Sequence, residues 1–187
     1  MRELIVLRHG ETEANVAGIA QGRQPYPLTE TGRAQAAAAG RFMERLAWRP
    51  THVLSSPVAR CVESASIVTG VLGLDSARTN EAFTEIDCGS AEGMAFRDIA
   101  FKTGFDQFGG ESNEQLFARV GAGLDALPDD EIILLVTHGG IFKAILHHLL
   151  GVRGQYWLGL RCGTCMRLEK RGPRHALSHL LHPEEVE

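Results

Sequence analysis

The chain has 187 residues, of which 44% are hydrophobic and 22% charged, and it carries a formal charge of −4 with a pI of about 6.1. This composition is typical of a soluble globular protein and excludes a disordered tail, a collagen-like chain and a small disulfide scaffold. The acidic balance argues against nucleic acid or an acidic membrane as a partner held by bulk charge. We expect one domain over residues 1–187.

The first half of the chain predicts two pairs of a strand and a helix. In order, we expect a buried strand at 4–7, a helical turn at 11–16, a loop at 18–27, a helix at 34–48, a strand at 52–56 and a helix from Pro57 to about Leu72. Thr29 is placed to cap the first long helix and Pro50 to end it. Gly73 is placed to end the next helix.

The second half begins with residues 77–110, which have no clear pattern beyond an extended piece at 77–79 and look like an insertion lying over another part of the molecule. Beyond it we expect a helix at 111–127, a buried strand at 131–137, a helix to about Leu150, and a strand pair at 164–169 and 176–181. This alternation predicts an α/β fold with three layers, in which helices cover both faces of a mostly parallel central sheet.

The cysteines and the apolar runs bear on the compartment. Four scattered cysteines favour a reducing, cytoplasmic location. Cys162 and Cys165 form a CxxC pair without a second pair, so we expect two thiols near the start of a strand, with a redox pair or half a zinc site as the alternative. The apolar runs are too short for a signal-peptide core or a membrane span.

Basic residues and histidines gather where three predicted strands end. Ligands of open α/β sheets bind at the carboxyl ends of the strands. The motifs at these ends are Arg8-His9-Gly10, Ser55-Ser56-Pro57 leading to Arg60, and Thr137-His138-Gly139-Gly140. One histidine after a strand is more often structural, but two histidines accompanied by two arginines predict a functional site at this edge.

The residue types in these motifs suit a phosphoryl group. Arg8 and Arg60 offer planar forks of donors, and the helices after the first and fourth strands point N–H groups to the same place. The local positive charge keeps a neighbouring imidazole neutral, and a neutral imidazole is a competent nucleophile. Because arginines and helix ends supply the positive charge, we expect neither a metal nor another cofactor.

Transfer of a phosphoryl group from an ester also needs a proton donor for the leaving oxygen, because expelling an alkoxide is costly. Glu85 is the candidate, in the segment Phe83 to Gly89. Asp87 is its rival, because alternation along an extended chain puts both carboxyl groups on one face. The pattern by itself favours Glu85 only slightly.

The ordered set of motifs resembles the histidine phosphatase superfamily, in its phosphoglycerate-mutase-like branch. The resemblance spans nearly the whole chain: Arg8 to Thr12 with Asn15, Pro27-Leu28-Thr29 with Gly32, Ser55 to Pro57 with Arg60 and Glu63-Ser64-Ala65, Glu85 with Gly89 and Glu92-Gly93, Gly110-Glu111-Ser112, and Thr137 to Gly140. Two positions depart from many relatives, which carry Asp where this chain has Pro25 and a bulky residue where it has Ala91. Both departures concern the leaving group rather than the phosphate core.

The resemblance implies a role for each residue at the strand ends. His9 would attack phosphorus and become phosphohistidine, while Arg8, Arg60 and His138 hold the equatorial oxygens. Glu85 matches the proton donor of the family.

Further substrate contacts follow from the same resemblance. Asn15 matches a position that contacts phosphate, with a water-facing polar helix residue as the alternative. Arg23 lies in a loop over the site, with a solvated arginine as the alternative, and Gly139 would let the backbone approach the substrate. Supporting or capping roles are expected of Glu11, Thr12 and Glu63.

The expected function is that of a phosphomonoesterase for a small phosphorylated metabolite, similar to α-ribazole-5′-phosphate phosphatases or to broad-specificity bacterial phosphatases. A phosphoglycerate mutase is the alternative, and a non-catalytic module that binds a phosphorylated partner is a third. Mutases of the family resemble longer chains with an enclosing insertion, whereas only 52 residues separate Glu85 from His138 here. The oligomeric state stays open.

Bulky apolar residues cluster between the predicted proton donor and the next helix. They suggest an apolar or ring-bearing leaving group, with a satellite core as the alternative, and they are Met94, Phe96, Phe101, Phe105 and Phe108.

Overall fold

The computed structural model describes residues 1–99, 104–153 and 160–182, and a six-stranded sheet lies at its centre. The strands are β1 (Glu3–Arg8), β2 (His52–Ser55), β3 (Arg78–Thr79), β4 (Ile132–Thr137), β5 (Cys165–Arg171) and β6 (Arg174–Leu181). Their order across the sheet is β3-β2-β4-β1-β5-β6. Strands β1 to β4 pair in parallel, whereas β5 is antiparallel to β1 and β6 is antiparallel to β5. The mostly parallel sheet and the carboxyl-terminal strand pair are therefore confirmed.

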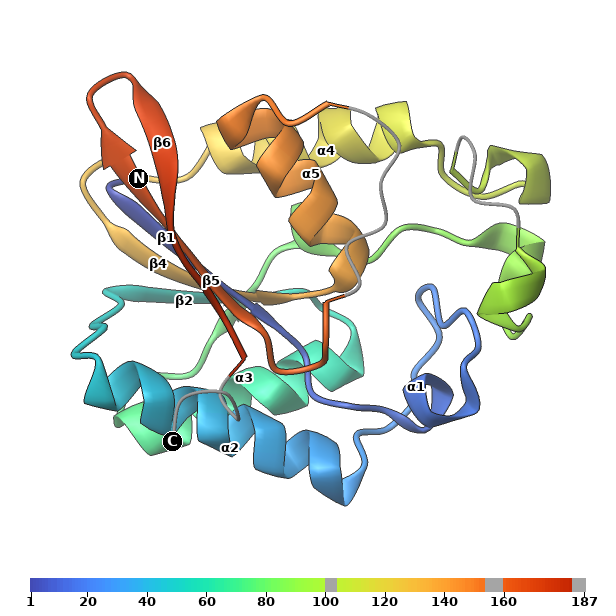
Figure 1. Ribbon diagram of the computed structural model, residues 1–187, viewed down its shortest axis with the longest axis horizontal. Helices are drawn as coiled ribbons and strands as arrows, with labels where there is room; N and C mark the ends of the chain where they lie inside the picture. Colours follow the sequence, from blue (N-terminus) through green and yellow to red (C-terminus); the bar gives the residue numbers. More distant parts are fainter. Residues whose placement is uncertain (100–103, 154–159, 183–187) are drawn as a thin grey trace.

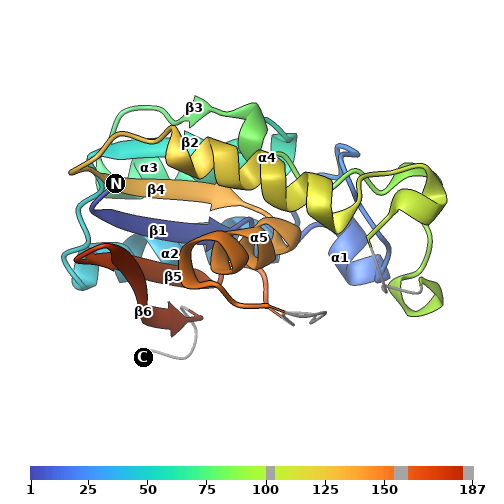
Figure 2. The same cartoon turned by 90° about the horizontal axis from the view of Figure 1, so that it is seen from above.

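Helices cover both faces of this sheet, as the alternating pattern predicts. Helices α2 (Glu30–Arg45) and α3 (Ala59–Leu72) pack on one face, and α4 (Asn113–Asp125) and α5 (Gly139–Leu150) pack on the other (Figures 1 and 2). The short helix α1 (Glu13–Ala17) lies beyond the carboxyl end of β1. Among the residues described, no helix has the length and the apolar character needed to cross a bilayer.

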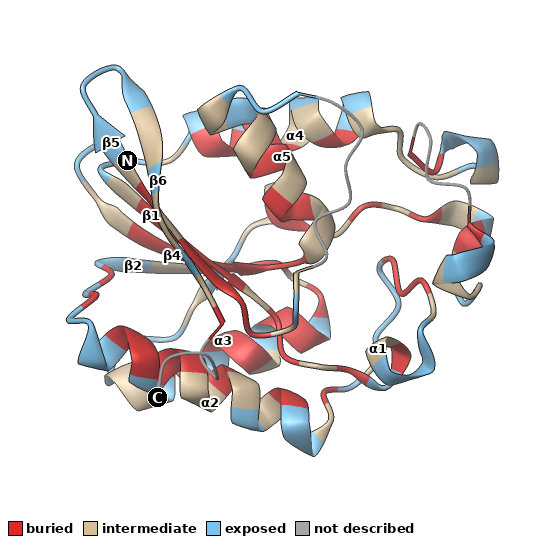
Figure 3. Cartoon of the chain, in the orientation of Figure 1, coloured by how far each residue is buried: buried red, intermediate tan, exposed pale blue. Residues whose placement is uncertain are grey.

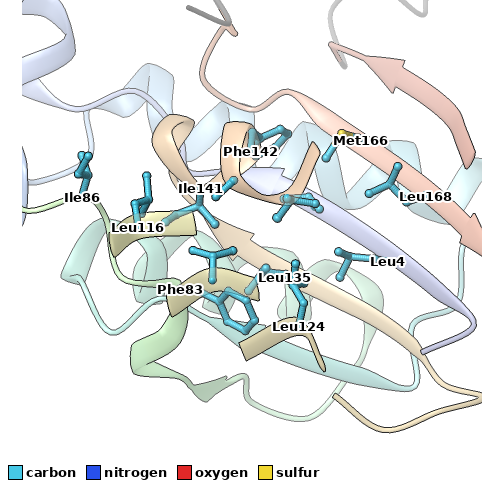
Figure 4. Packing of buried hydrophobic residues seen from close by; sticks show 14 of the residues in the cluster. Leu4, Phe83, Ile86, Leu116, Leu124, Leu135, Ile141, Phe142, Met166 and Leu168 are labelled. Carbon is cyan, nitrogen blue, oxygen red and sulfur yellow. The ribbon is translucent and has the colours of Figure 1, made fainter. Parts of the chain in front are cut away.

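The two faces of the central strands belong to two separate hydrophobic clusters. Leu4 and Val6 of β1 pack with α4 and α5, whereas Ile5 and Leu7 pack with α2 and α3. This alternation follows from the two-residue period of a strand, and coverage of both faces explains why the strand is apolar throughout. Figure 3 shows that the central strands β1 and β4 are buried along most of their length, and Figure 4 shows the cluster beneath α4 and α5. Each of these side chains stabilises the fold by roughly 1.5–3 kcal/mol.

The segment between β3 and α4 is part of the core rather than a loose cover. Its described residues form four short 3-10 turns, η1 (Glu81–Phe83), η2 (Gly89–Ala91), η3 (Phe96–Asp98) and η4 (Asp106–Phe108). Phe83, Ile86 and Phe105 are buried in the cluster under α4 and α5. This packing explains how a chain without regular hydrogen bonding keeps a defined course beside the sheet. Phe101 lies outside the described residues.

Two of the predicted helices have wrong boundaries, for local reasons. The helix expected at 34–48 spans Glu30–Arg45, because Thr29 accepts the amide of Gly32 and so starts the helix at once. The chain leaves the helix at Ala47, whose φ is 53°, and Trp48 then packs edge-on against Phe42. The next helix begins at Ala59 rather than Pro57, because Val58 is an extended cap residue.

The loop after β1 approaches the start of α2 more closely than a side chain would allow. A Cβ on Gly10 would overlap the carbonyl group of Gly32, and a Cβ on Gly32 would overlap the backbone of Glu11. Gly70 in α3 has open space at the same position.

We therefore expect Gly32→Ala to lower the free energy of unfolding by about 1–3 kcal/mol, since the crowded backbone must shift. Gly70→Ala is the matched control and should raise that free energy by about 0.5–1 kcal/mol, because a helical glycine is replaced without a collision. Urea denaturation measures both. Equal effects of the two substitutions would contradict the close approach.

Candidate active site

His9 follows β1 and is a buried, neutral imidazole of one tautomer. Its Nε2 atom lies 3.2 Å from Nε of Arg60, and its Nδ1 atom lies 2.7 Å from the carbonyl oxygen of Gly10. A guanidinium only donates, so Nε2 carries the lone pair and Nδ1 carries the proton. Burial lowers the pKa of His9 well below its ordinary value, and the charges of Arg60 and Arg8 lower it further. The lone pair is thus available near neutral pH.

Arg60, the second residue of α3, has only 1% of its surface exposed. It donates to the carbonyl oxygens of Gly22 at 2.8 Å and Gln24 at 3.0 Å, and its Nη2 atom lies 3.0 Å from Nδ1 of His138. These contacts hold the guanidinium rigidly beside His9. The loop that supplies the two carbonyl groups is positioned by the same contacts.

His138 caps α5 and lies behind Arg60. Because Arg60 donates to its Nδ1 atom, the proton is on Nε2, which donates to Oγ of Ser56 at 2.7 Å. Burial first and the charge of Arg60 second lower the pKa of His138 well below its ordinary value. Its ring lies 5.2 Å from that of His9. In the described structure His138 supports Arg60, and its predicted contact with a phosphate oxygen stays a prediction.

Arg8 ends β1 and presents an unsatisfied donor. Its Nη1 atom donates to the carbonyl oxygen of Leu160, whereas its Nε atom is buried and has no hydrogen-bond partner among the described residues. A buried donor without a partner costs about 1–3 kcal/mol, which an anion bound there would relieve. Gly139 lies beside this guanidinium, where even a Cβ would be 3.8 Å from Cζ of Arg8.

These groups meet in one cavity of about 600 Å³, counted with its open mouth. Its lining residues are Arg8, His9, Asn15, Gln21, Gly22, Arg60, Glu85, Ile86, Cys88, Phe96, Phe105, Gly139 and Gly140. The predicted nucleophile, both arginines and the predicted proton donor are therefore together at the carboxyl ends of the strands.

Glu85 is the carboxyl group that reaches this cavity. Its Oε1 atom accepts the amide of Ile86 at 2.9 Å and lies at the start of α5, where a Cβ on Gly140 would collide with it. Burial raises the pKa of Glu85, although Arg60 opposes the shift. Asp87 points elsewhere, since its side chain is 44% exposed and pairs with Arg23 at 3.6 Å. The cavity thus separates two carboxylates that the sequence pattern could barely distinguish.

Asn15 lines the cavity and is held in one orientation. Its Oδ1 atom accepts from the amide of Thr12 at 3.0 Å and lies 3.4 Å from Sγ of Cys162. The NH₂ group, which can donate two hydrogen bonds, is the part that Asn15 offers to an anion. The backbone N–H of Asn15 already donates to the side chain of Thr12 in the capping box of α1. The helix end at the cavity wall is that of α5, whose first residues Gly139 and Gly140 line the cavity.

Arg23 lies outside the cavity wall. Its Nε atom donates to the carbonyl oxygen of Glu85 at 3.1 Å, and its Nη2 atom lies 3.5 Å from Glu111. Arg23 is not among the described lining residues, and its contact with a substrate stays a prediction. This side chain instead borders a shallow hollow on the outer side of the Glu85 segment.

The expected supporting residues have structural partners. Thr12 caps α1, Glu11 accepts from Oγ1 of Thr29 at 2.8 Å, and Glu63 pairs with Arg33 at 2.7 Å. Each ties the loop after β1 or the start of a helix in place, and none of the three lines the cavity.

The CxxC pair is split between two environments. Cys165 is the first residue of β5 and is buried, while Cys162 contacts Asn15 at the edge of the cavity. All four cysteines are free thiols. Over the described ranges, no three His, Cys, Asp or Glu side chains lie close enough together to hold a metal ion.

Several lining residues were missed from the sequence. Gln21 contacts Oγ1 of Thr12 at 2.8 Å, and Ile86 and Cys88 flank Asp87 in an irregular segment. Glu85, Ile86 and Cys88 all reach one cavity, which strict alternation along an extended chain does not allow. A buried glutamine in a loop carries no periodic signal either.

The arrangement predicts that Arg60→Lys weakens the affinity for inorganic phosphate by about tenfold or more, because lysine cannot reproduce the fork that faces His9 and two carbonyl groups. The rise in melting temperature with phosphate concentration measures this affinity. Arg33→Lys, on the exposed side of α2, is the matched control and should leave the affinity unchanged. Equal phosphate protection of all three proteins would contradict an anion site at Arg60.

Known proteins show the same organisation. A phosphatase of Bacillus subtilis (strain 168), described as uncharacterized phosphatase PhoE, is 30% identical over 156 residues, which cover 81% of this chain and 79% of the relative. A 2,3-bisphosphoglycerate-dependent phosphoglycerate mutase of Methylobacterium sp. (strain 4-46) is 29% identical, with 91% of each chain covered. The solved mycobacterial glucosyl-3-phosphoglycerate phosphatase has a TM-score of 0.81 at 26% identity, with 97% of this chain and 99% of that chain covered.

The match to the mutase removes the argument that the chain is too short for a mutase. A chain of similar length carries the name of a mutase, so length alone does not separate a phosphatase from a mutase. The family model matches residues 4 to 169, a range that includes the site described above and the strands from β1 to β5 apart from their outermost residues, but not β6. The chain therefore belongs to the histidine phosphatase superfamily, branch 1.

Proposed function

We propose that the chain is a phosphomonoesterase that hydrolyses a small phosphorylated metabolite through a phosphohistidine intermediate. The observation that carries this proposal is the neutral His9, whose Nε2 lone pair faces Arg60 in the cavity that also holds Glu85. A positive cradle, a neutral nucleophile and a carboxyl group whose pKa is raised by burial are the three groups that the reaction needs.

In the first step, Nε2 of His9 attacks phosphorus and the bond from phosphorus to the ester oxygen breaks. The phosphate displaces the contact between His9 and Arg60, so the guanidinium donates to phosphate oxygens instead. Arg8 gains a partner for its buried Nε atom. Glu85 gives its proton to the departing oxygen, because an alkoxide is a poor leaving group.

In the second step, the carboxylate of Glu85 takes a proton from water, and the oxygen of that water attacks phosphohistidine. The bond from phosphorus to nitrogen breaks, the lone pair returns to Nε2, and inorganic phosphate leaves. The carbonyl oxygen of Gly10 accepts from Nδ1 throughout, which stabilises the positive charge that His9 carries as phosphohistidine.

One observation favours hydrolysis over mutase activity, since the names of the relatives include both phosphatases and mutases. A mutase for phosphoglycerate must also hold a carboxylate beside the transferred phosphate, and the cationic side chains among the described lining residues are Arg8 and Arg60, both at the phosphate cradle.

The remaining lining favours an apolar part in the leaving group. Ile86, Cys88, Phe96 and Phe105 line the cavity together with the polar Gln21. This wall supports a ring-bearing alcohol, such as that of α-ribazole-5′-phosphate, or a broad set of phosphomonoesters. The free thiols support a reducing cytoplasmic compartment.

The first test measures products. With p-nitrophenyl phosphate we expect inorganic phosphate to be released, and with 3-phosphoglycerate we expect 2-phosphoglycerate to form slowly or not at all. His9→Ala should reduce phosphate release by at least about 10³-fold, since the nucleophile is lost. Rapid interconversion with little free phosphate would show a mutase. Undiminished hydrolysis by His9→Ala would overturn the phosphohistidine mechanism, and phosphate binding without turnover by the wild type would leave a binding module.

The second test is the pH profile of kcat/KM. Activity should persist into acid, because the pKa of His9 is lowered and the imidazole stays neutral there. Activity on an alkyl phosphate should fall as pH rises through the raised pKa of Glu85, where the proton to be donated is lost.

Glu85→Gln should abolish this alkaline limb and lower kcat/KM for the alkyl ester by about 10²-fold or more. Phosphorylation by p-nitrophenyl phosphate should suffer much less, since its leaving group needs no proton. The phosphate ester also ionises as the pH changes, but it does so equally for both enzymes. The ratio of kcat/KM between the wild type and Glu85→Gln therefore reports on Glu85 alone. Equal losses for both esters would argue against Glu85 as the proton donor.

A further inference from the structure

The segment that carries Glu85 has no regular secondary structure, and two residues hold its backbone: Glu111 just before α4 and Arg119 in the middle of α4. Nη1 of Arg119 donates to the carbonyl oxygens of Ala82 at 2.9 Å and Thr84 at 3.0 Å. The amide of Glu111 donates to the carbonyl oxygen of Asp87 at 2.8 Å, and a carboxylate oxygen of Glu111 lies 3.4 Å from the amide of Asp87. The chain is therefore held on both sides of Glu85.

Glu111 and Arg119 also bind each other as a fork. Nε of Arg119 lies 2.9 Å from Oε1 of Glu111, and Nη2 lies 2.7 Å from Oε2. The two side chains are only 11% and 24% exposed. Such bidentate pairs are shorter and more directional than ordinary hydrogen bonds. A rigid pair of this kind transmits the position of α4 to the segment that it grips.

We propose that Glu111 and Arg119 are positioning residues that hold Glu85 in place for its proton transfer. Neither side chain is among the cavity lining, so they act through the backbone of the segment. The inference rests on the proposed role of Glu85 as the proton donor.

The same pair belongs to a balanced group of charges behind Glu85. Arg23 approaches Glu111 at 3.5 Å and Asp87 at 3.6 Å, so two guanidinium groups and two carboxylates lie together. The groups that face Glu85 from the other elements are Arg8 and His9 at the end of β1, Arg60 and Cys61 on α3, Cys88 on its own segment, and the amide of Gly140 on α5.

Removal of one member of the balanced group should shift the alkaline limb in a direction that depends on its charge. Glu111→Gln leaves an extra positive charge, which favours the anionic form of Glu85 and moves the limb to lower pH. Arg119→Gln leaves an extra negative charge and should move the limb to higher pH. A merely structural role would not produce opposite shifts.

The experiment compares kcat/KM for an alkyl phosphate and for p-nitrophenyl phosphate in the wild type, Glu111→Gln, Arg119→Gln and Arg119→Lys. We expect Glu111→Gln and Arg119→Gln to lower the alkyl rate by about tenfold or more, and the aryl rate by less than about threefold, since only the alkyl ester depends on the donor. Arg119→Lys keeps the charge without the fork, so it should show the rate loss without the shift of the limb.

The pair of Glu3 and Arg167 provides a matched control. Nη2 of Arg167 lies 2.7 Å from Oε2 of Glu3, and the side chains of Glu3 and Arg167 are 17% and 21% exposed. The pair joins β1 to β5, and neither residue lines the cavity. Glu3→Gln should change neither the ratio of the two rates nor the pH profile. If Glu111→Gln does not fold, Arg119→Lys still tests the rate ratio.

The outcomes separate the inference from the proposed function. An unchanged ratio and limb in the three variants, beside a large loss in Glu85→Gln, would overturn the positioning role alone. No loss of alkyl hydrolysis in Glu85→Gln would overturn the proposed donor and this inference with it. Equal losses for both esters in the Glu111 and Arg119 variants would show a general structural role and reject positioning.

Discussion

The hydrogen bond from Arg60 to Nε2 of His9 is the interaction on which the site depends. A guanidinium cannot accept, so this bond assigns the lone pair of His9 to the atom that faces the cavity. Burial lowers the pKa of His9, and the neighbouring cation of Arg60 lowers it further, because a protonated imidazole beside a buried cation is unfavourable. This contact thus settles the tautomer of the candidate nucleophile and, together with burial, favours its neutral form.

A buried arginine needs partners for all of its donors, and the fold is arranged around that need. The loop after α1 turns its carbonyl groups of Gly22 and Gln24 toward Arg60, and His138 accepts from Nη2, the nitrogen that also donates to Gly22. Residues from α3, the α1 loop and the start of α5 are thereby brought to one point. Arg8 differs, since its buried Nε atom has no such partner within the described structure and is the donor that an anion can satisfy.

Irregular chain carries the proton donor, and this has a physical reason. On a regular strand, successive side chains point to opposite faces, so only every second residue could reach the cavity. The segment around Glu85 instead turns successive side chains into the same cavity while Phe83 and Ile86 anchor it in the core. Buried backbone groups need hydrogen-bond partners, and this segment has no neighbouring strand or helical turn to provide them all. Arg119 and Glu111 donate to its carbonyl oxygens instead.

The sequence by itself determined the α/β class, the strands and most of the residues that line the cavity, because buried strands have apolar runs and the strand-end motifs are contiguous in the chain. Arg8, His9 and Gly139 follow directly from such motifs. The tertiary structure decided the rest: Glu85 over Asp87 in the cavity, Arg23 outside it, and His138 behind Arg60. These outcomes depend on contacts between segments far apart in sequence, made through irregular backbone, and neither periodicity nor spacing records which way such a chain turns its side chains.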